Sequence, residues 1–307
     1  MLLRQLLGRK NDCHYWVREI IGVTMGIGAI AFQQMPTSAQ IIADDTLPNN
    51  SQVTRIDNIR LIGGGTQAGS NLFHSFSEFS VPIGNTAHFF NGLEIQNIFS
   101  RVTGGSVSNI DGLIEANGNA NLFLINPNGI IFGNNASLNI GGSFLASTAS
   151  SLKFVDGKEF NATAPQNAPL LSIGVPLGLQ FGESPKAIVN ESGDVNLPGL
   201  EVQPGKTLGL VGGDIILKEG TLVAPDGRIE LGSVGSGSFV SLTPTNAGFV
   251  LGYEGVNKFQ DIRLSQESIV FTEGDSGGSI QLQGRNVTLS DGSVISANIT
   301  GAGTGGG

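Results

Sequence analysis

Few residues of this chain have the types and spacing that catalysis or metal binding requires. His74 and His88 are the histidines that follow the first 39 residues, and Cys13 is the only cysteine, so no zinc-ligand spacing is present. Ser and Thr are plentiful, but none has a nearby His to activate it as a nucleophile. No phosphate loop, dinucleotide fingerprint or nucleophile elbow occurs. We therefore predict no catalytic residue, no metal site and no cofactor.

Carboxylates are the remaining candidates for chemistry. Asp194, Asp214 and Asp226 fall in turn-like segments, where Asp is expected because its side chain bonds the local backbone. Whether they gather into a cluster depends on the fold. Asp44 and Asp45 lie in a short N-terminal lead-in, and we expect them to be solvated.

The segment Asn126 to Gly129, followed by Ile130, has the residues of a tight turn between two strands. Pro127 fixes φ at the second turn position, Asn128 tolerates the third, and Gly129 accepts a positive φ. Asn126 can cap the turn with its side chain. Taken alone, this motif is an ordinary strand connection.

The elements that would position these residues are indicated by apolar pairs that recur every seven residues. An i, i+2 pair lies on one face of a strand. Seven residues suit a short strand and a tight turn, and three such units make a coil of about 21 residues, in the range of solenoid repeats. The regular pairs are Leu208/Leu210, Ile215/Leu217, Leu222/Ala224 and Ile229/Leu231. The period extends to Val202, Val195 and Ile188, and returns at Ile262/Leu264, Ile269/Phe271, Ile280/Leu282, Val287/Leu289 and Val294.

A seven-residue period is also typical of a coiled coil, which needs apolar residues three and four apart and helix formers between them. Here the intervals hold Pro204-Gly205, Gly212-Gly213 and Asp291-Gly292, which break helices and form turns. The pattern therefore predicts an all-β solenoid.

Other segments vary this pattern. From Leu113 to Ala146 the pairs are eight residues apart, and from Leu72 to Phe99 strands are favoured over helix because Pro82 and Gly84 interrupt. Residues Lys153 to Pro185 lose the period, which indicates a loop, an added hairpin or a join. The Asn-rich stretch from Asn117 to Asn139 fits either simple turn preference or stacked amide ladders.

Composition agrees with a folded, exported chain. Gly is 46 of 307 residues and charged residues are only 13%, unlike disordered chains, which are rich in charge. Residues 1–39 have the basic, apolar and small-residue regions of a signal peptide, with cleavage predicted after Ala39. Removal takes away Cys13 and makes the net charge of −9 more negative, which disfavours nucleic acid as a partner.

The core at Asn126 to Ile130, with Ile110 to Ile114 before it and Gly142 to Thr148 after it, resembles the secretion domain of the filamentous haemagglutinin family, the exported partners of two-partner secretion systems. The resemblance covers about residues 40–185, and the segments from Leu208 and Ala224 look like the solenoid body of cyanobacterial-type members. The family's Asn-Pro-Asn-Leu motif is missing, and Ile98 to Gly104 stands near its expected place.

The resemblance implies a right-handed parallel β-helix, single-stranded and pectin-lyase-like, with extra-helical hairpins. It implies a signal peptide at 1–39, a secretion domain with an N-terminal cap at 40–185, and continuing coils at 186–307 that look interrupted at Gly307. The partner would be an outer-membrane barrel transporter with periplasmic repeats. The motif Asn126, Pro127, Asn128, Gly129 and Ile130 would be the secretion motif. The threading of an unfolded chain through a pore would account for the absence of cysteine after residue 39.

These observations favour a secreted or cell-surface adhesin that crosses the periplasm and outer membrane, with host or cell-surface glycans or proteins as candidate targets. The alternative is a β-helical enzyme acting on polysaccharides, which would gather Asp194, Asp214 and Asp226 on one outer face. A single-chain autotransporter passenger would need a C-terminal barrel, and the last residues hold no run of amphipathic strands.

Overall fold

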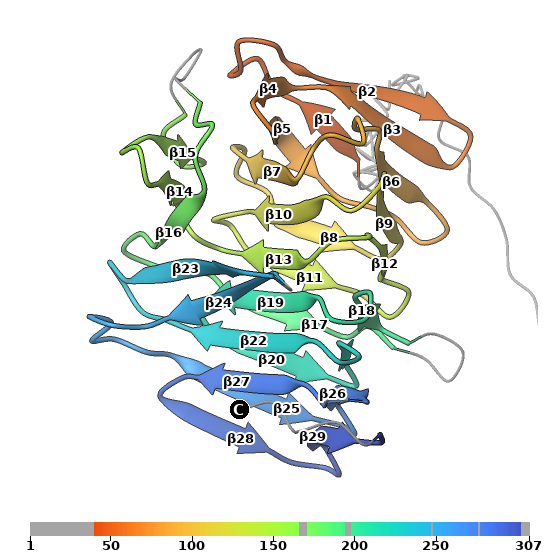
Figure 1. Cartoon of the computed structure of the whole chain (residues 1–307), viewed down its shortest axis with the longest axis vertical. Coiled ribbons are helices and arrows are strands. Elements are labelled where there is room, and N and C mark those ends of the chain that lie inside the picture. Colours follow the sequence, from red (N-terminus) through yellow and green to blue (C-terminus); the bar gives the residue numbers. More distant parts are fainter. Residues whose placement is uncertain (1–39, 166–170, 194–197, 247, 276, 302–307) are drawn as a thin grey trace, which may run out of the picture. The chain divides into compact units, whose positions relative to one another are not determined.

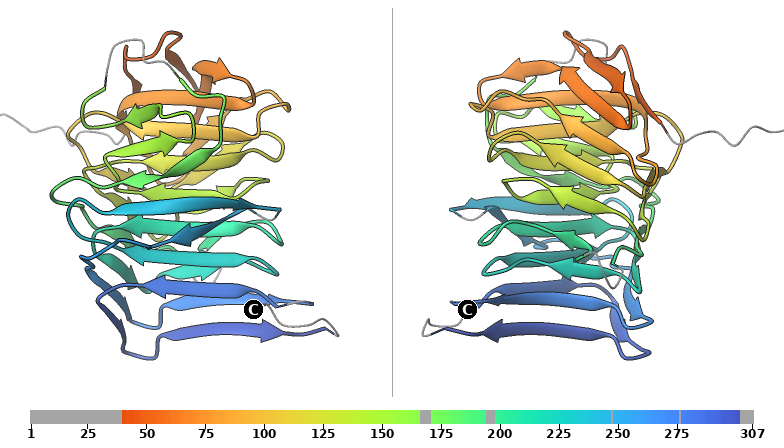
Figure 2. Two further views of the ribbon diagram at one scale, coloured as in Figure 1. Left: turned by 60° about the vertical axis from the view of Figure 1, so that its left-hand side comes forward. Right: turned by 90° about the vertical axis from the view of Figure 1, so that its right-hand side faces the viewer.

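The computed structural model describes residues 40–165, 171–193, 198–246, 248–275 and 277–301. Strands joined by turns make up this part of the chain, and no helix occurs within it. Each coil passes from a first face to a second and then to a third, and the strands of successive coils lie above one another (Figures 1 and 2).

The first face is one sheet, which contains β1 (Ile41–Ala43), β4 (Thr66–Ala68), β5 (Asn71–Phe79), β7 (Asn97–Val102), β10 (Asn121–Ile125), β13 (Phe144–Ser147), β19 (Thr207–Gly212), β22 (Arg228–Ser233) and β27 (Ser279–Gln283). The second face contains β8 (Ser108–Ile110), β11 (Ile130–Phe132), β17 (Ile188–Asn190), β20 (Ile215–Lys218), β25 (Asp261–Ser265) and β28 (Asn286–Leu289).

The third face is divided into two sheets. The N-terminal one contains β2 (Ser51–Ile56), β3 (Ile59–Gly64), β6 (Thr86–Phe89), β9 (Leu113–Ala116) and β12 (Ser137–Asn139). The C-terminal one contains β18 (Leu200–Glu201), β21 (Thr221–Val223), β26 (Ile269–Gly274) and β29 (Val294–Ile299). A separate hairpin sheet contains β14 (Ser151–Phe154), β15 (Glu159–Asn161), β16 (Pro176–Gln180), β23 (Phe239–Thr245) and β24 (Gly248–Gly252).

Pairing between coils is parallel and has the period that the apolar pairs predict. Leu208 lies beside Ile229 and Leu210 beside Leu231, so β19 and β22 are one coil apart in register. All four regular pairs from Leu208/Leu210 to Ile229/Leu231 are fully buried, because inward side chains of each coil pack on those of the next. The prediction of an all-β parallel β-helix with extra-helical hairpins is confirmed.

The predicted register is wrong in β26 and β29. Val270, not Ile269, pairs with the inward Leu222, and Ile295, not Val294, pairs with Val270. Ile269 is 42% exposed and Val270 is fully buried. The turn from β25 to β26 is one residue longer than the turn from β20 to β21, and a shift of one residue moves every side chain of a strand to its other face.

The last coil is less covered than the predicted inward pattern would suggest. Val287 and Leu289 of β28 are 43% and 44% exposed, while Ile280 and Leu282 of β27 are only partly buried against the core. No described strand lies beyond β27, β28 and β29, so these side chains have neighbours on one side only.

The first face is covered on its outer side by the hairpin sheet, seen beside it in Figure 1. Within the range Lys153 to Pro185, β15 and β16 belong to this sheet, so the loss of period there reflects an added hairpin. Inward Leu122 and outward Phe123 are 1% and 2% exposed, because sheets covered on both faces have continuous apolar strands. The outward row consists of Phe73, Phe99, Phe123, Leu145, Gly209 and Glu230.

Phe249 of β24 extends the aromatic part of this row. The ring centres of Phe73 and Phe99 are 5.2 Å apart, those of Phe99 and Phe123 4.9 Å, and those of Phe123 and Phe249 5.5 Å. Gly209 makes room for Phe249, since a Cβ there would already touch the ring at 3.4 Å. The hairpin is therefore fixed on the coils by ring packing.

Candidate functional site

The edge where the chain passes from the first face to the second, here named the first edge, carries the Asn126–Ile130 motif. Turns of successive coils stack along it, and they contain residues 103–107, 126–129, 181–187, 213–214, 253–260 and 284–285. Gly213 N donates to the Lys186 carbonyl at 2.8 Å, and Arg285 N donates to the Gln260 carbonyl at 2.7 Å. The motif is therefore one layer of a continuous hydrogen-bonded edge.

Asn126 joins this layer to the one before it. Its side chain is fully buried, and its Nδ2 donates to the Ser106 carbonyl at 3.0 Å and to Ser108 Oγ at 2.9 Å. Its Oδ1 accepts from Asn128 N at 2.9 Å, which is the predicted side-chain cap of the turn. The amide thus uses both donors and acts within the turn and between coils.

Asn128 and Gly129 complete the turn. Asn128 is half-buried, and its Nδ2 donates to the Gly104 carbonyl at 2.6 Å. Gly129 N closes the turn on the Asn126 carbonyl at 3.2 Å. The positive φ falls at Gly129, at 115°, and not at Asn128, so the backbone demand for glycine is at the fourth position.

Ile130 connects the motif to the core. It is fully buried, pairs with Ser108 on one side and Ile188 on the other, and its N donates to the Ala187 carbonyl at 3.4 Å. Pro127 is half-buried. The five motif residues therefore lie together at the first edge, and their role in secretion stays a prediction.

The segment Ile98 to Gly104 lies directly against this turn through the Asn128–Gly104 hydrogen bond, and it buries an arginine. Arg101 of β7 is 1% exposed. Its guanidinium donates to Ser75 Oγ at 2.8 Å, to the Asn161 carbonyl at 2.7 Å and to Thr46 Oγ1 at 2.8 Å. The same group lies 4.3 Å from the centre of the Phe160 ring, a cation–π distance.

Asp44 is the carboxylate of this cluster, so the prediction that it is solvated is wrong. It is half-buried and accepts hydrogen bonds from Thr103 Oγ1 at 2.6 Å and from Ser75 Oγ at 2.8 Å. Burial acts to raise the pKa of Asp44, but hydrogen bonds from Thr103, Thr46 and Ser75 outweigh it and place the pKa below its usual value. Burial lowers the pKa of Arg101 to about 10 and the Asp44 charge opposes that shift, so both groups are charged at neutral pH.

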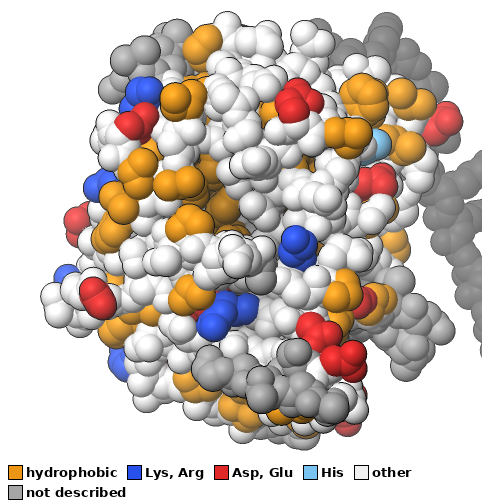
Figure 3. Space-filling model, in the orientation of Figure 1, with side chains coloured by type: hydrophobic (Ala, Val, Ile, Leu, Met, Phe, Trp, Pro, Cys, Tyr) orange, Lys and Arg blue, Asp and Glu red, His pale blue; other side chains and the backbone are white. Residues whose placement is uncertain are grey.

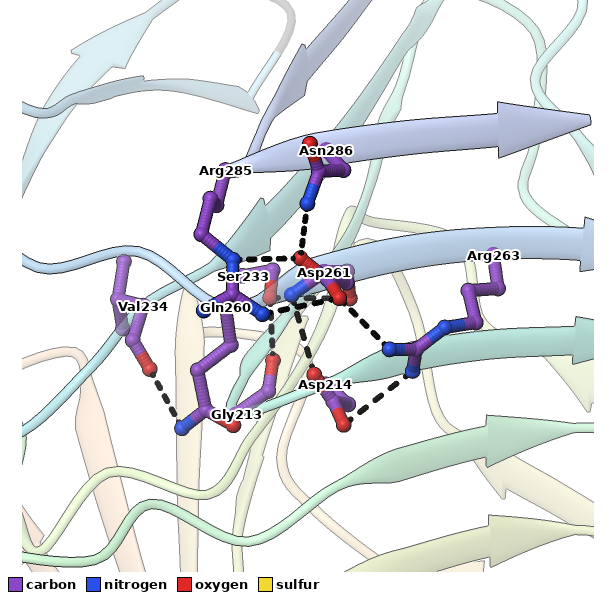
Figure 4. Close-up of polar contacts among 9 residues, drawn as sticks. All are labelled: Gly213, Asp214, Ser233, Val234, Gln260, Asp261, Arg263, Arg285 and Asn286. Carbon is purple, nitrogen blue, oxygen red and sulfur yellow. Dashed lines mark hydrogen bonds and ion pairs between the residues drawn. The ribbon is translucent and has the colours of Figure 1, made fainter.

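Further along the first edge, arginine and aspartate side chains make most of the side-chain hydrogen bonds (Figure 4). Asp261 accepts from Arg285 Nε at 2.9 Å, from Asn286 Nδ2 at 3.0 Å and from Arg263 at 2.6 Å. Its backbone N donates to Asp214 Oδ1 at 3.0 Å. The hydrogen bond from Arg285, with further help from Asn286 and the two arginine charges, lowers the pKa of Asp261 to about 2.

The carboxylates considered for an enzyme do not form one cluster. Asp214 lies at the first edge, whereas Asp226 lies in the turn from β21 to β22, where its N donates to the Glu273 carbonyl. Asp194 lies outside the described residues. The carboxylates that do meet, Asp214 and Asp261, are paired with Arg263 and Arg285, an arrangement that stabilises the anions and disfavours a general acid.

A second buried acid lies under the hairpin β23–β24. Glu230 is fully buried, and its Oε1 is 3.1 Å from the Arg228 guanidinium and 3.5 Å from Leu251 N. Its Oε2 and the Tyr253 hydroxyl have no hydrogen-bond partner among the described residues. Burial raises the pKa of Glu230 to about 7 despite the Arg228 charge. Burial and then the Glu230 charge raise the pKa of Tyr253.

The histidines occupy separate places. His74 is 1% exposed beside Ser51 Oγ at 3.0 Å, and burial lowers its pKa to about 3. His88 Nε2 contacts Asn117 Oδ1 at 2.9 Å. Asn117 also exchanges hydrogen bonds with Asn91 of the preceding coil. Stacked amides, one of the two interpretations of the Asn-rich stretch, occur at Asn121, whose Nδ2 donates to Asn97 Oδ1 of the preceding coil at 3.0 Å.

Sequence reasoning did not identify Arg101, Glu230 or the amides of the first face as members of polar sites. Two signals were present: Arg101 and Glu230 each stand inside a run of apolar residues that forms a strand. A charge in such a strand is expected to have a buried partner. Glu230 pairs with Arg228, two residues earlier in the same strand. Arg101 instead reaches Thr46, Ser75 and the Asn161 carbonyl, which lie far away in the sequence, so spacing could reveal only the partner of Glu230.

Comparisons with known proteins agree with this geometry. The model of the TPS secretion domain matches residues 39–282, and the chain therefore belongs to the family of two-partner secretion domains found at the N-terminus of filamentous haemagglutinin-type proteins. The crystal structure of the HMW1 secretion domain from Haemophilus influenzae is similar, with a TM-score of 0.50 and 17% identity over 84% of this chain. At that identity the likeness shows the fold alone.

The chain spans 66% of the length of the HMW1 structure. A search of curated proteins found no match. The family match runs past residue 185, and coils on both sides of that residue pair directly through β11 and β17. The proposed boundary at 185 and the cyanobacterial-type subfamily stay predictions. No helix long and apolar enough to cross a membrane lies in the part of the chain that the structure describes.

Proposed function

We propose that this protein is an exported adhesin of a two-partner secretion system, addressed by its N-terminal coils to an outer-membrane barrel transporter with periplasmic repeats. The observation that carries this proposal is the match of the TPS secretion domain to residues 39–282 of a parallel β-helix. The signal peptide at 1–39 would bring the chain to the periplasm. The mature protein would be secreted or held at the cell surface, with glycans or proteins of other cells as its targets.

Within this proposal the first edge is the part of the N-terminal coils that the transporter reads. Asn126 is fully buried and Asn128 is half-buried, so the transporter would contact Pro127 and Asn128 while Asn126 holds the turn in place. The hydrogen bond from Asn128 to the Gly104 carbonyl joins the motif to the segment Ile98 to Gly104. Recognition and folding are therefore coupled at one turn.

Export with and without the transporter tests the proposal. The full chain is produced in a bacterial host together with a barrel transporter encoded beside it, and the amounts in the periplasm and the medium are measured. We expect transfer to the medium only with the transporter, and retention in the periplasm when residues 40–185 are deleted. Secretion of the deleted form in equal amount would show that the N-terminal coils do not carry the address.

Point variants separate recognition from folding. Asn128→Ala is compared with Asn134→Ala, because Asn134 lies in a similar exposed turn and its side chain has no hydrogen bond within the described residues. Loss of export by Asn128→Ala with an unchanged melting temperature would assign the side chain to recognition. Equal export of both variants would remove Asn128 from the recognition surface.

A further inference from the structure

A groove of about 530 Å³ opens between the first face and the tip of the hairpin β23–β24. Figure 3 shows this side of the molecule, with hydrophobic side chains set back in a hollow left of the centre. The volume is in the range of small-molecule sites. The groove lies away from the first edge, on which the export proposal rests, and its lining has its own chemistry.

Amides form one wall of the groove. Asn71, Asn97 and Asn121 are neighbours in register on β5, β7 and β10. Asn121 Nδ2 donates to Asn97 Oδ1 at 3.0 Å, and Asn97 Nδ2 donates to Asn71 Oδ1 at 3.0 Å. Ser143 N donates to Asn121 Oδ1 at 2.8 Å, so the row continues into the next coil.

This ladder leaves hydrogen-bonding capacity unused. A side-chain amide has two N–H donors and two acceptor lone pairs. Along the row, Asn97 and Asn121 each use one donor and one lone pair. Each half-buried amide therefore keeps one donor and one acceptor for a ligand, and the two amides repeat at the strand spacing of about 4.8 Å. Two vicinal hydroxyls of a sugar, one accepting and one donating, match the free donor and the free acceptor of one such amide, and the next amide can bond further hydroxyls of the ligand.

The floor of the groove is apolar and the rim is basic. Phe123, Leu242 and Phe249 line the floor but are only 2–4% exposed. The exposed apolar side chains of the lining are Leu93 and Val175, at 81% and 48%, where the C–H face of a sugar ring can pack. Among the described residues, no Asp or Glu lines the groove, although the chain has a net charge of −9. Lys206 lines it, and among the described residues its ammonium group has no ion pair or hydrogen bond. A ligand with a negative charge is therefore favoured.

We propose that this groove binds an acidic oligosaccharide built from uronic acid residues. The sugar hydroxyls bond the amides of Asn97 and Asn121, one ring packs on the exposed side chain of Leu93, and a ring carboxylate pairs with Lys206. The site goes beyond the export proposal, because it assigns a ligand class to a surface outside the first edge. Its test uses purified protein, so its failure is distinguishable from failure of the export proposal.

Titration of the purified protein with tetragalacturonic acid tests the site. We expect saturable binding in calorimetry and shifts of the Asn97 and Asn121 side-chain amide signals in NMR. Maltotetraose, which has no carboxylate, should bind at least about tenfold more weakly. Lys206→Met should weaken tetragalacturonate binding by a similar factor, whereas the exposed Lys218→Met should leave it unchanged.

A second variant fills the groove without touching the core. Val175 lines the groove and is 48% exposed, so Val175→Trp should abolish binding and keep the melting temperature. Absence of tetragalacturonate binding up to about 10 mM, or binding that survives Val175→Trp, would overturn the site. Equal binding of tetra-aspartate would show that charge alone is read and would overturn the sugar assignment.

Discussion

The guanidinium of Arg101 donates to the carbonyl oxygen of Asn161 at 2.7 Å, across 60 residues of sequence. The bond joins β7 of the first face to the end of β15 in the hairpin sheet, and the same arginine reaches Thr46 of the N-terminal lead-in. Three segments that are separate in sequence thus meet at one charged side chain. Asp44 supplies the counter-charge and is linked to it by Thr46 and Ser75, whose hydroxyls bond both groups.

Replacement of Arg101 should be among the most destabilising changes in the N-terminal coils. Arg101→Met removes three hydrogen bonds and leaves Asp44 without its counter-charge, so we expect a loss of about 3–5 kcal/mol in the free energy of unfolding. Arg101→Lys should keep only part of the lost free energy of unfolding, because one ammonium group cannot make all the hydrogen bonds of the planar guanidinium. Urea denaturation measures both. Exposed Arg55→Met is the control and should change stability by less than about 0.5 kcal/mol; an equally small effect at Arg101 would contradict the cluster.

Glu230 should make stability depend on pH. Its pKa is raised from 4.5 to about 7 in the folded protein, so the folded state binds this proton more tightly than the unfolded state. The contribution of Glu230 to the free energy of unfolding is fully present below about pH 4.5 and is lost as the pH rises through about 7. The total loss is about 2–3 kcal/mol. Glu230→Gln resembles the neutral acid at every pH. We therefore expect the free energy of unfolding of this variant to fall less between pH 5 and pH 8 than that of the natural protein.

The comparison requires unfolding curves of the natural protein and the variant at both pH values. Glu183→Gln, at an exposed position, controls for the loss of one carboxylate and should leave the slope unchanged. A Glu230→Gln slope that matches the natural protein would mean that Glu230 is ionised throughout this range.

The two asparagines of the first-edge turn should differ in their effect on stability. Asn126→Ala leaves Ser108, the Ser106 carbonyl and Asn128 N without their partner, which should cost about 1–3 kcal/mol. Asn128→Ala removes chiefly the bond to the Gly104 carbonyl and should cost about 1 kcal/mol or less. Thermal melting of the purified variants gives the order. The reverse order would show that burial of Asn126 does not decide the strength of the turn.

The corrected register of β26 can be tested by a pair of neighbours. Val270→Ala removes two methyl groups from a fully buried side chain and should cost about 2 kcal/mol. Ile269→Ala removes more carbon atoms from a side chain that is 42% exposed, yet it should cost less. Denaturant unfolding of both variants gives the two free energies of unfolding, and their order tests the register. A larger loss for Ile269→Ala would restore the register that the seven-residue period predicts.

Periodicity predicted the coils because inward pairs such as Leu208/Leu210 must recur wherever a coil closes. The predicted register was wrong at β26, because a fixed seven-residue period assumes turns of equal length and the turn before β26 has one extra residue. The Asn126–Ile130 turn was predictable because most of its geometry is local: Pro127 and Gly129 suit its backbone, and Asn126 Oδ1 accepts from Asn128 N.

The polar sites were not predictable in this way. The Asn71 amide donates to the Ser172 carbonyl 101 residues away, and Thr207 contacts Phe249 across 42 residues. Such contacts depend on where the inserted hairpins return to the coils, and no spacing in the sequence encodes that position. The same holds for the groove, whose floor combines β10 with β23 and β24.

The hairpin sheet makes the unfolding of neighbouring coils more cooperative. An array of coils that touch only their neighbours can fray one coil at a time from either end. Here β16 and β23 pair antiparallel, and they emerge from insertions on either side of the coil that contains β19. Loss of that coil would break this pairing, so the interval from β13 to β22 should open as one cooperative unit. In a chain that leaves its transporter N-terminus first, that unit could close only after β23 had emerged.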